Sequence, residues 1–389
     1  MDLRKLVDKI KPTFEKGGKL GFLHSTFDAF ETFLFVPNTV TRKGAHVRDC
    51  VDLKRVMIMV VLALVPAMLF GIWNVGYQHS EAFGLDWGFW QIVGHGLIKV
   101  LPLYIVAYVV GLAIEFVSAQ IKGHEVNEGY LVSGMLIPLI VPVDVPLWML
   151  AVAVAFAVII GKEVFGGTGM NIWNPALLTR AFLFFSYPSM MSGDTVWTGG
   201  VTRFMNEGVA FQAGNGLVDG FSGATPLANA TLENLSPKFM DMIIGTIPGS
   251  VGETSVIAIL IGAFILLWTG VASWKIMLSS VVGGLAIGYL GYAVGATDLP
   301  GYYQLVMGGF LFGTVFMATD PVTSAQTECG KWIYGFLVGA LAVTVRIWNP
   351  GYPEGMMLAI LLMNTFAPLI DHYVVEGSIK RRAKKVKTA

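Results

Sequence analysis

The sequence predicts an all-α polytopic membrane protein with about ten transmembrane helices, and three observations lead to this fold class. Hydrophobic residues make up 54% of the 389 residues and charged residues only 13%, about half the charged share of an ordinary soluble domain. Several apolar runs reach the ~20 residues that are needed to cross a hydrocarbon core. Finally, short stretches of the first half recur in the second half at a nearly constant distance, which indicates an internal duplication.

Hydropathy divides the chain into ten candidate membrane spans. The third and the fifth of them are short or interrupted by proline, which weakens a helix. The ten spans are 56–73, 97–118, 129–143, 146–162, 175–188, 255–272, 275–293, 303–320, 331–346 and 354–373. The segment Asn74–Ile98 is then predicted to be a loop on the outer side of the membrane.

Basic residues indicate the orientation of these spans. Of the 26 Lys and Arg residues, 11 lie in residues 1–55 and six in residues 377–389. Because positively charged flanks stay in the cytoplasm, both termini are expected inside, as an even number of spans allows. This orientation places 22 basic residues inside, with Lys162 and Arg180 among them, and four outside, with Arg346 among them. The polar start of the chain is too long and too charged for a secretory signal.

The chain is therefore divided into five parts. We expect a cytoplasmic extension, a first five-helix repeat, an outer loop, a second five-helix repeat and a basic cytoplasmic tail. In the same order these parts are residues 1–55, 56–188, 189–254, 255–376 and 377–389.

Three pairs of matching stretches carry the repeat. They are GLAI at 111–114 and 284–287, LVSG at 131–134 with LVMG at 305–308, and IWNP at 172–175 and 347–350. An odd number of helices per half forces the second copy to enter the membrane from the opposite side, which produces an inverted repeat. The proline-interrupted stretches 137–146 and 316–324 correspond in the two halves and are expected to be broken helices near the midplane, where such backbone lines a cavity.

Four acidic residues lie in or beside the apolar segments, namely Glu115, Glu163, Asp320 and Asp371. A charge in a membrane is costly and is a functional candidate by default. Carboxylate oxygens suit Na⁺ or H⁺, so an ion path is one interpretation. The alternative is that these residues lie at interfaces and pair with nearby Lys, His or backbone groups. Phe312 and Phe316, one helical turn apart, either narrow such a path or simply pack.

The Gly-rich stretch 166–180 matches neither a dinucleotide fingerprint nor a phosphate-binding loop. It carries two carboxamides, Asn171 and Asn174, on either side of Trp173. Asn side chains both donate and accept hydrogen bonds, which fits the edge of a planar heterocycle. The alternative is a polar cap on a re-entrant turn. With two Cys and no HxxxH spacing among six His, no metal site within the chain is expected.

The predicted outer loop contains the stretch DGFSGAT at 219–225. Its last residue, Thr225, presents a hydroxyl among small neighbours, which suits enzymatic esterification. As four common residues, SGAT alone is weak evidence.

Long stretches spread over the whole chain resemble the B subunits of Na⁺-translocating NADH:quinone oxidoreductases, a bacterial respiratory complex. The matching stretches are HVRDCVDLKRVMIMV (46–60), HEVNEGYLVSG (124–134), KEVFGGTGMNIWNPAL (162–177), DGFSGAT (219–225), IPGSVGETS (247–255), FMATDPVTS (316–324) and NPGYPEGMMLAIL (349–361). The related D subunit of Rnf-type ferredoxin:NAD⁺ complexes shares the core but lacks an extension like residues 1–55, so it is the alternative.

The resemblance implies two flavins. FMN would be joined through its phosphate to Thr225, outside the cytoplasm, with the rest of the motif around it. That surrounding set is Asp219, Gly220, Ser222, Gly223 and Ala224. A non-covalent riboflavin would lie in the membrane part, with Asn171, Trp173 and Asn174 as its nearest candidates here.

The resemblance also implies a quinone, an ion and several partners. The quinone region corresponds to Gly111 and Glu115, although Leu112 replaces a second Gly of close relatives. Electrons from NADH would arrive through a subunit with FAD and an iron–sulfur centre, a second FMN subunit and small membrane subunits. Na⁺ would move outward, with Glu115, Asp320, Asp371, Phe312 and Phe316 as path candidates. A flavin transferase is expected for maturation, and no nucleic acid.

Two functions from other classes fit the same helix pattern. One is a passive solute channel of the urea-transporter kind, which would be colourless and has no use for DGFSGAT in an outer loop. The other is a structural anchor for partner subunits, against which the intramembrane carboxylates argue.

Overall fold

The computed structural model describes residues 3–14, 53–122, 129–192, 196–200, 223–228, 238–349 and 354–388, together with the single residues 21, 24, 27, 31, 35 and 44. Within these ranges the chain is helical, without strands. The α-helices are α1 (Leu3–Phe14), α3 (Leu53–Phe83), α4 (Phe89–Lys122), α5 (Tyr130–Ile140), α6 (Leu147–Val158), α7 (Pro175–Ser186), α10 (Phe239–Ile244), α11 (Val256–Trp268), α12 (Trp274–Val294), α13 (Tyr303–Val306), α14 (Phe310–Phe312), α15 (Glu328–Trp348) and α16 (Gly355–Thr388). π-Helical turns follow α6 at Ile159–Glu163 and α14 at Gly313–Met317, and a short 3₁₀ turn covers Pro188–Met190.

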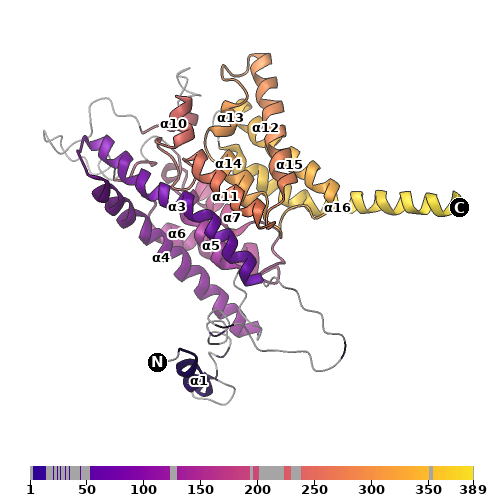
Figure 1. The fold of residues 1–389 in the computed structure, drawn as a ribbon, viewed down its shortest axis with the longest axis horizontal. Helices are drawn as coiled ribbons and strands as arrows, with labels where there is room; N and C mark the ends of the chain where they lie inside the picture. Colours follow the sequence, from indigo (N-terminus) through magenta and orange to yellow (C-terminus); the bar gives the residue numbers. More distant parts are fainter. Residues whose placement is uncertain are drawn as a thin grey trace.

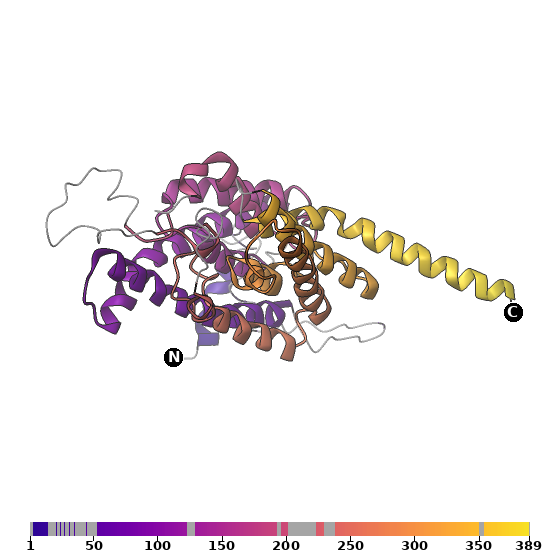
Figure 2. The same cartoon turned by 90° about the horizontal axis from the view of Figure 1, so that it is seen from above.

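Long helices flank a centre of short ones. Figure 1 shows α3 and α4 side by side on one flank and α12, α15 and α16 on the other, with α5, α7, α11 and α14 between them. Figure 2, seen from above, shows the same division and the end of α16 extending away from the bundle. The central element α5 has eight of its 11 residues buried, and all five residues of the π-helical turn Gly313–Met317 are buried.

Small residues allow the closest helix contacts. A methyl group at Gly283 of α12 would collide with the carbonyl oxygen of Phe336, and one at Gly339 of α15 would collide with that of Ser280. Such close backbone approach is typical of helix pairs in membranes, where lipid supplies no hydrophobic driving force between helices. It holds α12 and α15 together along their lengths.

The outer faces of the long helices are apolar. Five helices are long and apolar enough to cross a membrane, and three shorter apolar helices accompany them in the described part of the chain. Large side chains such as Trp90, Ile98, Ile121 and Trp268 are exposed on these surfaces. A soluble monomer rarely exposes apolar surface on this scale. The prediction of an all-helical, multi-pass membrane protein is therefore confirmed.

Two details of the predicted layout are wrong. The expected outer loop Asn74–Ile98 is mostly helical, because α3 continues to Phe83 and α4 already begins at Phe89. The expected span 303–320 is not one helix but α13, α14 and a π-helical turn. Both errors arise because hydropathy reports only the length of an apolar stretch. Polar residues can extend a helix beyond that stretch, and the pair Gly308–Gly309 can divide a helix within it.

Candidate functional site

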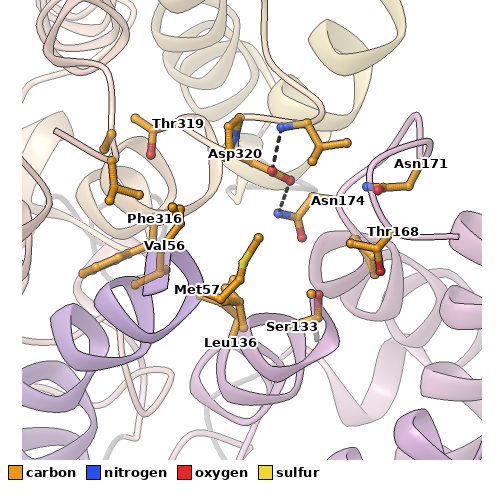
Figure 3. A pocket seen from close by; sticks show the side chains of 18 of the residues that line it. Val56, Met57, Ser133, Leu136, Thr168, Asn171, Asn174, Phe316, Thr319 and Asp320 are labelled. Carbon is orange, nitrogen blue, oxygen red and sulfur yellow. Dashed lines mark hydrogen bonds between the residues drawn. The ribbon is translucent and has the colours of Figure 1, made fainter. Parts of the chain in front are cut away.

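A cavity of about 80 Å³ lies where the two halves of the chain meet. Figure 3 shows that it receives side chains from the start of α3 and from α5, from the loop before α7, and from the chain after the second π-helical turn. Its polar lining residues are Ser133, Lys162, Thr168, Asn171, Asn174, Thr319 and Asp320. The sequence-predicted candidates Asn171, Asn174, Phe316 and Asp320 therefore border the same space.

Asn174 connects the two halves across this cavity. Its Oδ1 accepts hydrogen bonds from the backbone N–H groups of Ala176 and Leu177, at 3.0 and 3.4 Å, and so caps α7. Its Nδ2 donates to Oδ2 of Asp320 at 3.3 Å, the contact drawn in Figure 3. Pro175 at the first helical position completes a favourable helix start. The alternative interpretation, a polar cap, therefore describes the Asn174 oxygen.

Asp320 is held by three donors. Besides Asn174, the N–H of Val322 donates to Oδ1 at 3.0 Å and the hydroxyl of Thr323 donates to Oδ2 at 3.1 Å. A carboxylate with these partners is fixed in position without a cationic side chain. Thr319 lies beside it on the cavity wall. The oxygen atoms of this wall come from the second half of the chain.

The other two residues of the predicted carboxamide group diverge. Asn171 is buried at the cavity and donates from Nδ2 to the carbonyl oxygen of Trp173 at 3.0 Å. The Trp173 indole does not line this cavity; its Nε1 donates to Oγ1 of Thr365 on α16 at 3.0 Å. The structure thus brings Asn171 and Asn174 together and directs Trp173 to an apolar groove between α7, α15 and α16.

Glu115 forms a buried ion pair with Lys162 of the first π-helical turn, and both side chains are 4% exposed. The sequence analysis did not identify this partner, which is 47 residues from Glu115 along the chain. Gly111, one turn earlier on α4, lies against the ring of buried Tyr130, and a methyl group at Gly111 would collide with that ring. Lys162 also lines the cavity. Of the predicted quinone residues, Glu115 is therefore connected to the cavity through the side chain of Lys162.

The remaining acidic candidates have local partners. Glu163 accepts from the hydroxyl of Ser118 and from the ammonium of Lys122, at 2.9 Å for the latter. Asp371 accepts from the N–H groups of Gln326 and Thr327, at 2.7 and 3.0 Å, just before α15 begins. The interpretation as paired groups near helix ends therefore describes these two residues.

The two phenylalanines of the predicted path contact each other. Their ring centroids are 5.0 Å apart, Phe312 is fully buried, and Phe316 borders the cavity. Phe312 is not among the residues that line the cavity, and its contact with Phe316 fits the packing interpretation. Of these two phenylalanines, Phe316 lines the cavity.

A second group of buried charges was missed by the sequence analysis. Arg180 of α7 donates to Glu253 at 2.6 Å and to Glu354. Arg346 lies beside them, buried, and donates to the carbonyl oxygen of Gln304 at 2.6 Å. Together they border a cavity of only about 20 Å³. The available signal was the repeat itself, because Arg180 and Glu354 follow the two copies of IWNP.

This group also corrects the charge count. Lys162, Arg180 and Arg346 are buried in the protein interior, so they report nothing about which loops face the cytoplasm. The two basic ends, residues 1–55 and 377–389, still hold most of the basic residues.

Thr225 directly precedes a short helical turn at residues 226–228, in the described segment 223–228. Its half-buried hydroxyl accepts from the N–H of Ala228 at 3.2 Å. Gly223 and Ala224 are buried, and Leu227 packs with Met242, Leu299 and Met307. Asp219, Gly220 and Ser222 lie outside the described residues.

Thr225 and the cavity belong to opposite ends of α3. Val56 near the helix start lines the cavity, whereas Asn74 donates to the carbonyl oxygen of Ile247, close to the cluster that anchors Leu227. At about 1.5 Å per residue, Val56 and Asn74 are about 27 Å apart along the helix. This separation is close to the ~30 Å of a hydrocarbon core.

The fold and the cavity define a multi-pass membrane protein with a polar, charge-lined site between its two halves. Residues 40–380 match the model of the NQR2, RnfD, RnfE family, and the chain belongs to this family. It is 45% identical to the B subunit of the Na(+)-translocating NADH-quinone reductase of Pseudomonas paraeruginosa, over 98% of this chain and 99% of that one. The corresponding protein of Ectopseudomonas mendocina is 45% identical over the same shares. That of Chromohalobacter salexigens is 43% identical, over 99% of this chain and 97% of that one.

Proposed function

We propose that this chain is the membrane subunit of a complex that passes electrons from NADH to a quinone and moves Na⁺ outward. Relatives that carry this activity in their names align with it nearly end to end, which is the observation that supports the proposal most. The cytoplasmic-side extension 1–55 favours this complex over the Rnf type, because the alignment covers 98% of the chain. The other expected partners are the subunits that hold FAD, the iron–sulfur centre and the second FMN.

The proposal includes two inverted five-helix halves in a bacterial inner membrane, with both termini in the cytoplasm. Corresponding elements support it by packing against each other: the first helices of the halves, α3 and α11, are in contact, and so are the fifth, α7 and α16. An inverted repeat relates its halves by a two-fold axis in the membrane plane. Contacts between like elements are what such an axis produces.

In this proposal FMN is bound covalently to the oxygen of Thr225, on the outer side. The hydroxyl lies half-buried at the start of a turn and is held by one backbone N–H. Leu227 packs beside it against the α13 region. These contacts would fix the attachment point.

The cavity between the halves is the proposed site of the non-covalent riboflavin. The donors and acceptors there are the Asn171 and Asn174 amides and the Ser133 and Thr168 hydroxyls, which suit the imide edge of an isoalloxazine. The volume of about 80 Å³ matches the edge of the ring system. Met57 lies at the wall in Figure 3, and its flexible side chain would give way to the rest. The flavin supplies electron transfer, and the protein positions and tunes it.

The ion and the quinone are proposed to use the acidic residues at this cavity. Asp320 offers carboxylate oxygens beside Thr319, which suit a hard cation. Glu115 lies behind Lys162, on the helix to which the resemblance assigns the quinone. Moving one charge against 100 mV costs about 2.3 kcal/mol, which is small against the energy released between NADH and a quinone.

The covalent flavin provides the test of this function. Denatured chain from cells that contain the flavin transferase should fluoresce in a gel and weigh one FMN residue more than its sequence. Thr225→Ala should abolish both signals, and Thr231→Ala, six residues further on, should abolish neither. An unmodified, colourless wild-type chain would contradict the proposal and favour a solute channel or an anchor.

A further inference from the structure

The side chain of Lys162 lies between the cavity and Glu115. The π-helical turn Ile159–Glu163 buries its side chain at the cavity wall, and Glu115 lies on its other side. π-Helical turns are rare and occur often at functional sites. Of the described residues that line the cavity, Lys162 alone is basic and Asp320 alone is acidic.

The pairing of Lys162 with Glu115 is incomplete on the carboxylate side. Oε1 of Glu115 accepts from the ammonium, whereas Oε2 is buried without a hydrogen-bond partner among the described residues. A buried charge in this state is costly. One proton on Oε2 would remove that cost and release the ammonium from its counter-ion.

Among the residues that the structure describes, the ammonium has few other partners. Its nitrogen lies 5.8 Å from the centroid of the Tyr130 ring, a weakly attractive position. The Tyr130 hydroxyl is already used, since it donates to the carbonyl oxygen of Ala107 at 2.8 Å. An ammonium released by Glu115 therefore faces the cavity.

We propose that Lys162 is a positioning residue that links the charge in the cavity to the protonation of Glu115. This inference rests on the proposed flavin site. With Glu115 ionised, the Lys162–Glu115 pair is neutral and balances no further charge. When one electron, supplied by NADH through the partner subunits, enters the cavity, Glu115 takes up one proton from water. The ammonium then balances the added negative charge.

The other described ionisable groups around Glu115 have partners of their own. Glu163 on the π-helical turn is paired with the ammonium of Lys122 and accepts a hydrogen bond from the hydroxyl of Ser118. Tyr108 on α4 donates to the carbonyl oxygen of Leu131 at 2.8 Å, and Tyr130 is bonded as described above. Across the cavity, Asp320 has three donors of its own. Glu115 is therefore the group that changes its protonation, and Lys162 is the cation that this change releases.

The test is a redox titration of the non-covalent flavin in the purified complex, at several pH values. In the wild type the midpoint potential should fall as pH rises, beyond the ring's own pH dependence, because the proton on Glu115 becomes harder to obtain. Glu115→Gln leaves the ammonium always available, so the potential should stay near the upper limit. Lys162→Met removes the cation, so the potential should stay near the lower limit at every pH.

The two variants should differ by about tenfold or more in the reduction equilibrium constant, as one unit charge nearby implies. Lys99→Gln, which removes a partly exposed cation near the other end of α4, is the control and should follow the wild-type curve. Extracted non-covalent flavin is measured in every sample. If the wild-type complex contains none, the proposed site itself is wrong.

If both variants keep the flavin and reproduce the wild-type curve, the role of Lys162 is wrong while the flavin site stands. Should Lys162→Met lose its flavin, Glu115→Gln decides alone. A raised potential with a shallower pH dependence supports the linkage, and an unchanged curve overturns it.

Discussion

Two groups of buried charges hold this protein together, and they differ in what surrounds them. Arg180, Glu253, Glu354 and Arg346 enclose only about 20 Å³, and Arg180 satisfies both carboxylates. Lys162 and Asp320 face each other across about 80 Å³ without touching. A charge that is paired in a tight space stabilises an arrangement, whereas one that borders a larger cavity can respond to a ligand. The first group therefore joins elements of the two halves, and the second borders the cavity of the proposed functional site.

The largest effect is expected from Arg180→Met. This change leaves Glu253 and Glu354 without their shared donor, and breaking such a buried pair costs about 3–5 kcal/mol. The amount of assembled complex and its thermal midpoint, followed by the retained covalent flavin, measure the loss. Arg180→Lys keeps one charge but not the fork that reaches both carboxylates, so it should fall between. If the complex that carries Arg180→Met is as stable as the wild type, the first charged group does not stabilise the protein, which would contradict the comparison.

A smaller change in stability and a larger one in function are expected from Asp320→Asn. The amide keeps the size of the side chain and an oxygen for the N–H of Val322, so assembly and both flavins should survive. Sodium should lose its accelerating effect on quinone reduction, or should act only at a much higher concentration. The measurement is the rate as a function of sodium. Unchanged sodium dependence would reduce Asp320 to a helix-terminal group.

The smallest effect is expected from Asp371→Asn, the matched control for Asp320→Asn. Asp371 accepts from two backbone N–H groups before α15, and weakening such a cap costs about 1 kcal/mol. The thermal midpoint should fall slightly while the sodium dependence stays as in the wild type. A loss of sodium dependence here would extend the ion site to Asp371.

Sequence patterns predicted the elements of this fold better than its contacts. Each of the ten expected spans contains helical residues, because apolar length is a local property. The ends were less accurate: α3 runs ten residues beyond the predicted limit of 73, since the polar residues Asn74, Gln78 and Ser80 face the protein and remain helical.

The sequence patterns did not predict which distant residues form pairs. Lys162 meets Glu115 only because α4 and the first π-helical turn pack together, and Arg180 meets Glu354 only because α7 contacts α16. Trp173 shows that neighbours in the sequence can also lie at different sites in the structure. Its neighbours Asn171 and Asn174 turn to the cavity, whereas its indole bonds to Thr365, because three successive positions of a turn point in different directions.

The central claim is that the cavity between the halves holds the non-covalent flavin. The most direct measurement is the amount of that flavin, per covalent flavin, in complex that carries Ser133→Leu. Ser133 lines the cavity, so the added carbons should displace the edge of the proposed flavin and remove most of the extractable riboflavin, while the FMN proposed on Thr225 would report an intact chain. Ile105→Phe adds similar bulk to an exposed face of α4 and should leave both flavins in place. Full retention of riboflavin with Ser133→Leu would contradict the account.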